Sequence, residues 1–261
     1  MIDIHTHILP GVDDGAKNWN DTLNMAKAAV AEGITTLIAT PHHANGKYMN
    51  TAIEVIERTR QINEQLIVEG VPITIRSGQE IRLHGDWLDS WYRKELLPLA
   101  DSRYVLIELP SSRIPKELYE LIYELNILNM KPIIAHPERN AEIMKHPDRL
   151  ANLIERGAWA QVTTHSLLGG FGKRIEKLAW TLCKRGLIHI VSSDAHHVER
   201  RGFRLREAYN VIGDVMGEQW QNYFLNNAQC VIDDRPFEIQ PVEKPSSGGI
   251  LHRLGSYLRN H

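Results

Sequence analysis

The chain has 261 residues, of which 43% are hydrophobic and 24% charged, the composition of an ordinary folded protein. Thirty lysines and arginines against 32 aspartates and glutamates give a formal net charge of -2. This balance argues against a dedicated nucleic-acid-binding protein, because such proteins usually carry a basic excess. Two cysteines exclude a disulfide-rich scaffold and favour a reducing, cytoplasmic location. The thirteen histidines are unusual, since histidine is the commonest metal ligand and a frequent acid or base.

Strand and helix patterns alternate along the chain. Strands are predicted at residues 1–6, 34–40, 73–81, 104–109, 131–136, 158–163 and 187–193. Helices are predicted at 19–32, 51–69, 115–129, 147–156, 173–185, 204–214 and 218–226. Nearly continuous apolar runs, as in Val105-Leu106-Ile107, are typical of strands buried on both faces of a parallel sheet. The alternation predicts βαβ units, and both a closed barrel and an open doubly wound sheet fit it.

The two ends of the chain need separate treatment. The polar first residues predict no signal peptide, and no apolar stretch approaches the roughly 20 residues that span a bilayer. Pro236, Pro241, Pro245 and the run Ser-Ser-Gly-Gly at 246–249 have the composition of a linker. We therefore predict one domain over residues 1–235 and a linker with a short basic tail over 236–261. That tail fits a membrane-surface or docking helix as well as a tail packed on its own domain.

Histidines and carboxylates stand at or just after the carboxyl ends of six predicted strands. His5 and His7 are two residues apart on the first strand, so they share one face. The other members of this set are His42, Glu80, Glu108, His136, Asp194 and His196. Because the carboxyl ends of parallel strands meet on one face, where active sites lie, we expect these side chains to converge.

Three further positions join this set. The glycine-flanked loop Gly11-Val12-Asp13-Asp14-Gly15 supplies one more carboxylate. Spacing separates its two aspartates poorly, and we take Asp14 rather than Asp13 as the ligand. His43 and His197 are neighbours of stronger candidates and are expected to orient a ligand or a substrate group.

Nine candidate ligands exceed the needs of one metal ion, since zinc takes about four. Imidazole and carboxylate ligands without thiolate suit manganese, iron or zinc. Clustered divalent ions are typical of hydrolysis at phosphorus. Arginine matches phosphate geometry, and we expect Arg139 and Arg206 at the same mouth. A cysteine phosphatase is excluded, because neither Cys183 nor Cys230 is followed by arginine after five intervening residues.

Four motifs resemble those of the PHP (polymerase and histidinol phosphatase) superfamily. They are Asp3-Ile4-His5-Thr6-His7, Thr40-Pro41-His42, His136-Pro137-Glu138-Arg139 and Ser193-Asp194-Ala195-His196. The longer phrases around them, and Gly78-Gln79-Glu80-Ile81, are similar to the CpsB/CapC/YwqE-type tyrosine-protein phosphatases of bacterial capsule and exopolysaccharide loci. The similarity runs from residue 1 to about residue 230.

This resemblance implies a distorted (β/α)7 TIM-like barrel with a trinuclear site that usually depends on Mn²⁺. One metal would be held by His5, His7, Glu80 and Asp194. A second would share Glu80 and add Glu108 and His136, and a third would take Asp14, His42 and His196. Arg139 and Arg206 match the phosphate-orienting arginines. If the reaction needs a general acid, His43 or His197 is the nearest candidate.

The family substrate is the phosphorylated tyrosine cluster in the tail of a cognate kinase, which acts with a membrane adaptor in polysaccharide synthesis. A cytoplasmic chain without a transmembrane segment would then meet the membrane through that kinase complex. The alternatives are a small-molecule phosphatase acting on histidinol phosphate and a non-enzymatic module that docks on the kinase. An amidohydrolase also begins with His-x-His, but it typically bridges its metals with a lysine that is missing at the corresponding strand end.

Overall fold

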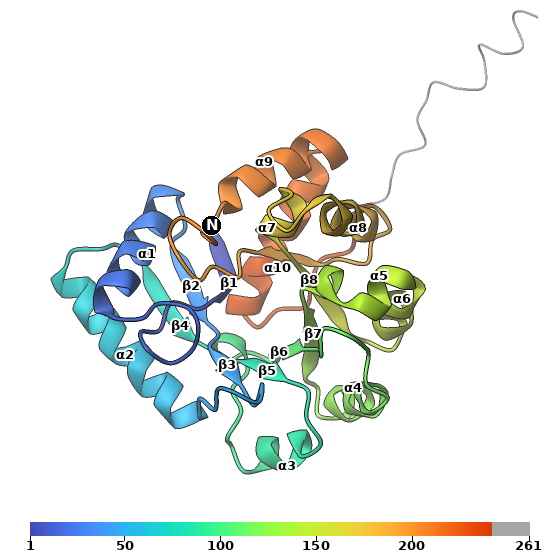
Figure 1. Cartoon of the computed structure of the whole chain (residues 1–261), viewed down its shortest axis with the longest axis horizontal. Helices are drawn as coiled ribbons and strands as arrows, with labels where there is room; N and C mark the ends of the chain where they lie inside the picture. Colours follow the sequence, from blue (N-terminus) through green and yellow to red (C-terminus); the bar gives the residue numbers. More distant parts are fainter. Residues whose placement is uncertain (242–261) are drawn as a thin grey trace, which may run out of the picture.

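The computed structural model describes residues 1–241, in which strands and helices alternate (Figure 1). The strands are β1 (Ile2–Thr6), β2 (Thr36–Ala39), β3 (His42–His43), β4 (Thr74–Ser77), β5 (Glu80–Arg82), β6 (Tyr104–Glu108), β7 (Lys131–Ala135), β8 (Trp159–Thr163) and β9 (Ile190–Ser192). The helices are α1 (Trp19–Ala31), α2 (Ala52–Val68), α3 (Trp87–Tyr92), α4 (Glu117–Ile127), α5 (Ala141–Lys145), α6 (Asp148–Glu155), α7 (Thr164–Leu167), α8 (Lys173–Lys184), α9 (Leu205–Met216) and α10 (Glu218–Ile232). Two 3-10 turns cover Leu99–Asp101 and Pro137–Arg139.

The strands form two sheets, and within each sheet all neighbouring strands are parallel. One sheet has the order β1-β2-β4 and the other β3-β5-β6-β7-β8-β9. Beyond β9 the chain returns to β1, where Asp194 N donates to His5 O and His7 N donates to Ala195 O, each at 2.9 Å. The carboxyl end of β1 therefore lies beside the loop that follows β9.

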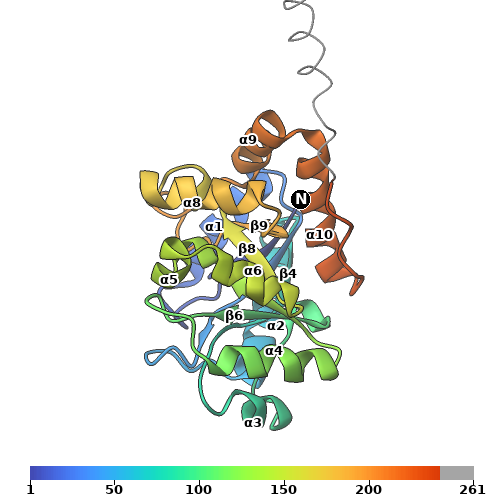
Figure 2. The ribbon, with the colours of Figure 1, turned by 90° about the vertical axis from the view of Figure 1, so that its right-hand side faces the viewer.

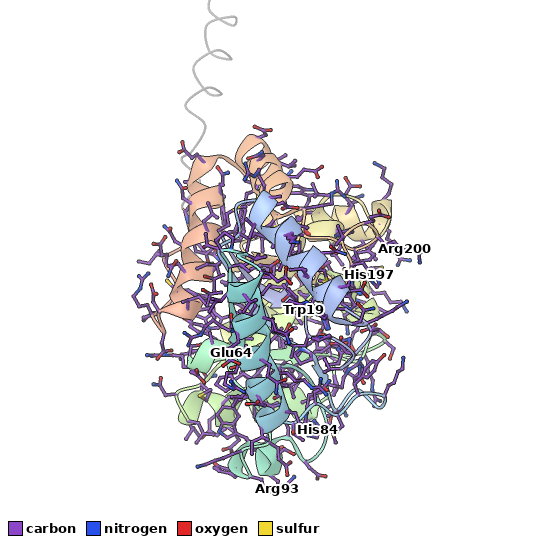
Figure 3. The ribbon with its side chains drawn as sticks, turned by 90° about the vertical axis from the view of Figure 1, so that its left-hand side faces the viewer. Trp19, Glu64, His84, Arg93, His197 and Arg200 are labelled. Carbon is purple, nitrogen blue, oxygen red and sulfur yellow. The ribbon has the colours of Figure 1, made fainter. Side chains whose placement is uncertain are left out.

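Both faces of the central strands are buried, as the continuous apolar runs predict. Along β6, Val105 and Ile107 face the helices, whereas Leu106 faces inward with Ile133 and Ile190. This alternation follows from the two-residue period of a strand. Figure 3 shows α1 and α2 side by side on the outside of the fold.

Helix α10 covers the amino-terminal ends of the strands. Its Ala228 and Val231 join the inward-facing cluster, and Tyr104, the first residue of β6, belongs to the same cluster. Figure 2 shows α10 on the opposite side of the strands from α5. The carboxyl ends therefore form the face that remains for a site. No helix among residues 1–241 is long and apolar enough to cross a membrane.

The strand predicted at 73–81 is wrong as a single element. It divides into β4 and β5, which belong to different sheets. The chain crosses between the sheets at Gly78, where a Cβ atom would lie 2.9 Å from Ile38 Cγ2 and 3.0 Å from Leu99 Cδ2. Helices α3, α5 and α7 were also missed, because four to six residues are too few to display a helical period.

Phe237 and Gln240, in the segment predicted as linker, contact the domain. The Phe237 ring stacks on Tyr104 with centroids 4.6 Å apart and meets the edge of Trp159 at 4.8 Å. Gln240 Nε2 donates to Gly186 O at 2.6 Å. The packed chain thus continues past the predicted boundary at residue 235, because proline-rich composition carries no information about which surface an extended segment covers. The rest of the predicted tail, 242–261, lies outside the described residues.

Replacing Phe237 tests this packing. Phe237→Ala should lower the free energy of unfolding by about 2 kcal/mol, because it removes a half-buried ring from two aromatic neighbours. Ile239→Ala is the control, since that side chain is 93% exposed and should change the free energy by less than about 0.5 kcal/mol. Urea denaturation of both variants measures the difference, and equal stabilities would contradict the packed arrangement.

Candidate metal centre

The nine predicted ligand residues lie together at the carboxyl ends of the strands. They form four overlapping groups, and within each group one ligand atom per residue lies within 4.8 Å of all the others. The groups are His7, Asp14, His42 and His196; His5, His7 and Glu80; His5, His136 and Asp194; and His42, Glu80 and Glu108. Because the groups share His5, His7, His42 and Glu80, they make one continuous cluster.

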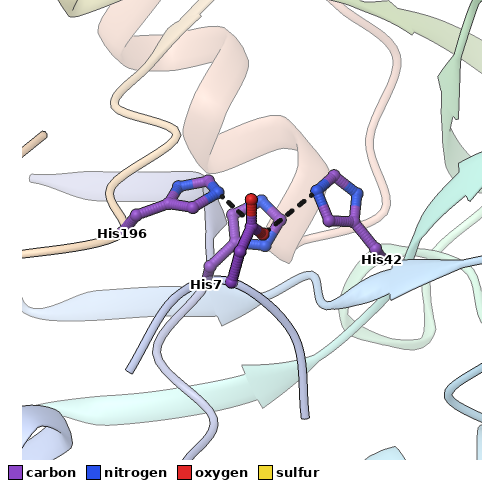
Figure 4. Close-up of side chains that lie close together, drawn as sticks. His7, His42 and His196 are labelled. Atoms are coloured by element: carbon purple, nitrogen blue, oxygen red, sulfur yellow. Dashed lines mark ion pairs between the residues drawn. The ribbon is translucent and has the colours of Figure 1, made fainter. Parts of the chain in front are cut away.

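The imidazoles of His7, His42 and His196 lie together at the outer end of the cluster (Figure 4), and Asp14 belongs to the same ligand group. Asp14 Oδ1 lies 3.4 Å from His42 Nε2 and 3.4 Å from His196 Nε2. The rings of His7 and His196 are 3.9 Å apart between centroids. Imidazoles this close repel one another when all are protonated, whereas neutral rings can share a bound cation.

Glu80 occupies the middle of the cluster and is fully buried. Its Oε2 lies 3.4 Å from both His5 Nε2 and His7 Nε2 and 2.8 Å from His42 Nδ1. Its Oε1 lies 2.7 Å from His136 Nε2. Burial raises the pKa of Glu80, but the surrounding imidazoles outweigh that effect and hold the pKa well below its usual value.

Asp194 connects the histidines to two arginines. Its Oδ1 lies 3.3 Å from His5 Nε2 and 3.2 Å from His7 Nε2. Its Oδ2 accepts hydrogen bonds from Arg139 Nη2 at 2.6 Å and from Arg201 Nη2. The backbone at Asp194 is left-handed, with φ 56°, and so is that at His136, with φ 34°. Such strained positions persist only where the surroundings enforce them, which is common at functional sites.

The hydrogen bonding of two buried carboxylate oxygens indicates whether the cluster suits a metal ion. Glu80 Oε2 and Asp194 Oδ1 are buried and make no hydrogen bond within residues 1–241, although imidazole nitrogens surround both. A buried carboxylate oxygen without a hydrogen bond is costly, and a bound cation removes that cost. The oxygen and nitrogen donors are also those that manganese, iron and zinc accept, so the residues fit a metal centre.

The protonation states describe how the cluster balances its charge without a cation. Burial lowers the pKa of His42, but Glu80 and Asp14 outweigh it and raise the pKa to about 10. Burial and the Arg139 charge lower the pKa of His136 to about 3. Some imidazoles therefore carry protons that neutralise the carboxylates, and a metal cation would take over that role because ligand nitrogens must be deprotonated.

The far nitrogens of two histidines are held by neighbours. Asp13 Oδ2 lies 2.7 Å from His7 Nδ1, and Gln161 Oε1 lies 3.1 Å from His5 Nδ1. Each oxygen accepts a hydrogen bond from Nδ1–H, so that Nε2 presents its lone pair to the cluster. Asp13 therefore lies behind His7, whereas Asp14 lies among the ligand groups. Gln161 escaped prediction because it stands within a strand rather than at its end.

Glu108 takes part in two interactions. Its carboxylate forms a bidentate pair with Arg82, with both hydrogen bonds at 2.9 Å, while Oε2 also lies 3.8 Å from His42 Nδ1. Burial and the nearby charge of Glu80 raise the pKa of Glu108, and the Arg82 charge opposes them. The Glu108 carboxylate thus has an arginine partner as well as a position at the cluster.

The structure separates the two predicted arginines. Arg139 reaches Asp194, but Arg206 donates to Glu32 O at 2.9 and 2.7 Å and lies against Gly33, three residues before β2. That is the amino-terminal end of β2, whereas the cluster follows its carboxyl end, so the placement of Arg206 at the mouth is wrong. Arg206 lies on α9, which begins at Leu205, after the loop that follows β9 has left the cluster.

Arg201 stands where Arg206 was expected. Besides its bond to Asp194, its Nη1 lies 3.2 Å from His196 Nε2. The Phe171 ring lies 5.4 Å from the Arg139 guanidinium carbon and 5.8 Å from that of Arg201, within cation–π range of both. The available signal was the position of Arg201 in the loop that follows a site-bearing strand, five residues after His196.

Neither predicted accessory histidine joins the cluster. His43 points to the other face of β3, where its Nδ1 lies 2.6 Å from Asn50 O and its ring neighbours His84. Consecutive residues on a strand alternate between faces, so the placement of His42 in the cluster turns His43 away. His197 is half-buried at the rim, with its ring 6.4 Å from that of His196.

A small hollow opens beside the cluster. It has a volume of ≈ 250 Å³ and is lined by His42, Glu80, Glu108, His136, Arg139 and Arg201, together with Leu109, Ser111, Ala135, Pro137 and Asn140. Both guanidiniums and four of the metal-ligand candidates thus face one space. Parallel strands that place such a set around a hollow define the class: an α/β protein equipped for metal-dependent hydrolysis of phosphate esters.

Comparisons with known proteins agree with this class. The family model described as capsular polysaccharide synthesis, CpsB/CapC, matches residues 1–233. The tyrosine-protein phosphatase YwqE of Bacillus subtilis is 43% identical over 243 residues, covering 93% of this chain and 96% of that protein. The tyrosine-protein phosphatase CpsB of Streptococcus pneumoniae is 28% identical over 241 residues, covering 90% of this chain and 99% of that protein.

A solved structure is similar over nearly the whole chain. It comes from work on YwqE from Bacillus subtilis and CpsB from Streptococcus pneumoniae, described there as metal-dependent tyrosine phosphatases. The TM-score is 0.89 at 42% identity, and the match covers 94% of this chain and 100% of the other. This chain therefore belongs to the CpsB/CapC family, and the resemblance found in the sequence is confirmed.

The contact behind His5 yields a prediction about metal affinity. Gln161→Leu should raise the dissociation constant for Mn²⁺ about tenfold, because His5 loses the acceptor that holds its tautomer. Gln161→Glu keeps an acceptor and should stay closer to the wild-type value. Isothermal titration with Mn²⁺ measures the constants, thermal unfolding checks that both variants are folded, and equal affinities in all three proteins would refute the orienting role.

Proposed function

We propose that this chain is a metal-dependent protein-tyrosine phosphatase of capsular or exopolysaccharide synthesis. The observation that carries the proposal is the Asp194 carboxylate, which faces His5 and His7 with one oxygen and Arg139 and Arg201 with the other. A phosphate ester held by the arginines would therefore lie next to the metal cluster. The family and the relatives named as tyrosine-protein phosphatases support this reading.

The metal centre would use the nine residues of the cluster. We infer Mn²⁺ as the ion and three ions as the complement, with the four carboxylates Asp14, Glu80, Glu108 and Asp194 contributing the negative charge. Bound divalent ions would supply Lewis-acid stabilisation of phosphate oxygens and activation of water. The overlap of four candidate groups, each sharing a residue with another, supports a multinuclear site over a single ion.

The arginines would hold the substrate phosphate. A guanidinium offers two parallel N–H donors that match two phosphate oxygens, and it remains charged at every relevant pH. The Phe171 ring lies within cation–π range of both guanidiniums. Asp194 holds them in place before substrate arrives, so little ordering is left to be done on binding.

The leaving group needs little help from this chain. Tyrosine phenolate, with a pKa of about 10, leaves more readily than an alkoxide. His197 is the one predicted acid that stays at the rim, and His43 faces the other side of β3. A phosphocysteine route has no support, because Cys183 and Cys230 are buried. Burial raises the pKa of the Cys183 thiol, which disfavours a thiolate.

The wider setting follows from the same family. We propose that the substrate is the phosphotyrosine-bearing tail of a bacterial tyrosine kinase, and that the enzyme acts in the cytoplasm. We also propose that the two sheets belong to one distorted (β/α)7 barrel, since the loop after β9 hydrogen-bonds to β1. The phosphatase domain would comprise the predicted residues 1–235 together with the packed segment up to residue 240.

Two arginine variants test the function and the corrected site together. Arg201→Ala should reduce kcat/KM for p-nitrophenyl phosphate about 100-fold, because a charged donor to the phosphate is lost. Arg206→Ala removes the same charge at the far end of β2 and should change kcat/KM by less than about threefold. Steady-state assays in Mn²⁺-containing buffer measure both values. Equal losses in the two variants, or no hydrolysis by the wild type, would contradict the proposal.

A further inference from the structure

A second, larger hollow adjoins the metal cluster on its other side. Its volume is ≈ 840 Å³, and it runs between the first turns of α1 and the loop 196–200. Figure 3 shows His197 and Arg200 of that loop on the same side of the molecule as Trp19, the first residue of α1. This hollow, which we call the α1 groove, is lined by Asp13, Asp14, Gly15, Lys17, Asn18, Asp21, Asn24, Met25, Tyr48, His196, His197, Val198, Glu199 and Arg200.

The α1 groove and the small hollow meet at the cluster itself. Asp14 and His196 line the groove, and both lie against His42, which lines the small hollow. Arg200 faces the groove, while the next residue, Arg201, faces the small hollow. A molecule whose phosphate lies beside Arg139 and Arg201 therefore has the α1 groove as its continuation.

The lining of the α1 groove suits a polypeptide better than a small metabolite. Sites for small molecules are mostly apolar and enclosed. Here the side chains are largely amide, imidazole, hydroxyl and charged groups. Asn24 and His197 make no side-chain hydrogen bond within residues 1–241, which leaves donors and acceptors free for main-chain N–H and C=O groups. Tyr48 adds an aromatic surface stacked on His42.

Apart from the aspartates that pair with histidines of the metal cluster, the α1 groove carries equal numbers of positive and negative side chains. Asp13 is paired with His7, and Asp14 with His42 and His196. The remaining charged side chains are two cations, Lys17 and Arg200, and two anions, Asp21 and Glu199. None of these four makes an ion pair within the described part of the chain, so each remains able to pair with a side chain of the opposite sign.

We propose that the α1 groove binds the polypeptide segment adjacent to the phosphotyrosine, so that the enzyme prefers a phosphotyrosine within a peptide to an isolated aryl phosphate. This inference rests on the proposed function, and it assigns the groove as the surface that sets the preference. Asn24 is an exposed groove residue outside the metal cluster. Lys27, one turn further along α1, is also exposed but does not line the groove.

The test compares two substrates in three proteins loaded with Mn²⁺. The substrates are p-nitrophenyl phosphate and a phosphotyrosine peptide with several residues on each side. Asn24→Trp fills the groove and should lower kcat/KM for the peptide at least tenfold, mainly through KM, while hydrolysis of p-nitrophenyl phosphate changes less than twofold. Lys27→Trp, the control one turn further along the same helix and outside the lining of the groove, should leave both substrates unchanged.

The outcomes separate this inference from the proposed function. If the wild type hydrolyses both substrates but Asn24→Trp affects them equally, or affects neither, the groove assignment is overturned and the phosphatase function stands. If the wild type hydrolyses neither, the proposed function fails and the inference with it. The unphosphorylated peptide supplies a second measurement: it should inhibit hydrolysis of p-nitrophenyl phosphate by the wild type and lose that effect in Asn24→Trp, and equal inhibition of both would refute the proposal.

Discussion

The burial of two carboxylates among imidazoles is the constraint on which the rest of the site depends. Glu80 and Asp194 are almost inaccessible to solvent, and each has one oxygen without a hydrogen bond in the described chain. Such groups are tolerated only when positive charge lies next to them. Protonated histidines and two arginines supply part of that charge, and metal cations held by the clustered donors would supply the remainder. The positions of the histidines and arginines around Glu80 and Asp194 follow from this requirement for positive charge.

The amino and carboxyl ends of the strands have different surroundings, and this difference satisfies the constraint. At the amino ends, α10 and the segment that carries Phe237 cover the inward-facing apolar residues. At the carboxyl ends, polar side chains replace apolar ones and line a small hollow with two arginines and a larger groove along α1. Left-handed backbone at His136 and Asp194 turns their side chains inward at the points where their strands end. Stability and function are thus concentrated at opposite ends of the same sheets.

Sequence reasoning succeeded where a local pattern determines the position of a side chain. Histidines two apart on β1 had to share a face, and polar residues at strand ends had to meet, so the nine clustered residues were predictable. It failed where position depends on the path of a loop: Arg201 and Arg206 are both plausible by spacing, yet only the course of the chain between β9 and α9 decides which reaches Asp194. The two-residue period of a strand also predicts that His43 points away from His42, but the Thr40-Pro41-His42 motif does not show that these residues lie on a strand. Contacts such as that of Gln161 with His5 join residues 156 positions apart and leave no local signature.

The number of divalent ions bound per chain tests the central claim most directly. The measurement is elemental analysis of the purified full-length chain after loading with Mn²⁺ and removal of free metal. Overlapping ligand groups around Glu80 and Asp194 predict more than one tightly bound ion per chain. Because Glu80 belongs to two of the four groups, the Glu80→Gln variant should bind fewer ions per chain. A single ion, or none, in the wild-type chain would contradict the account of the cluster as a multinuclear metal centre.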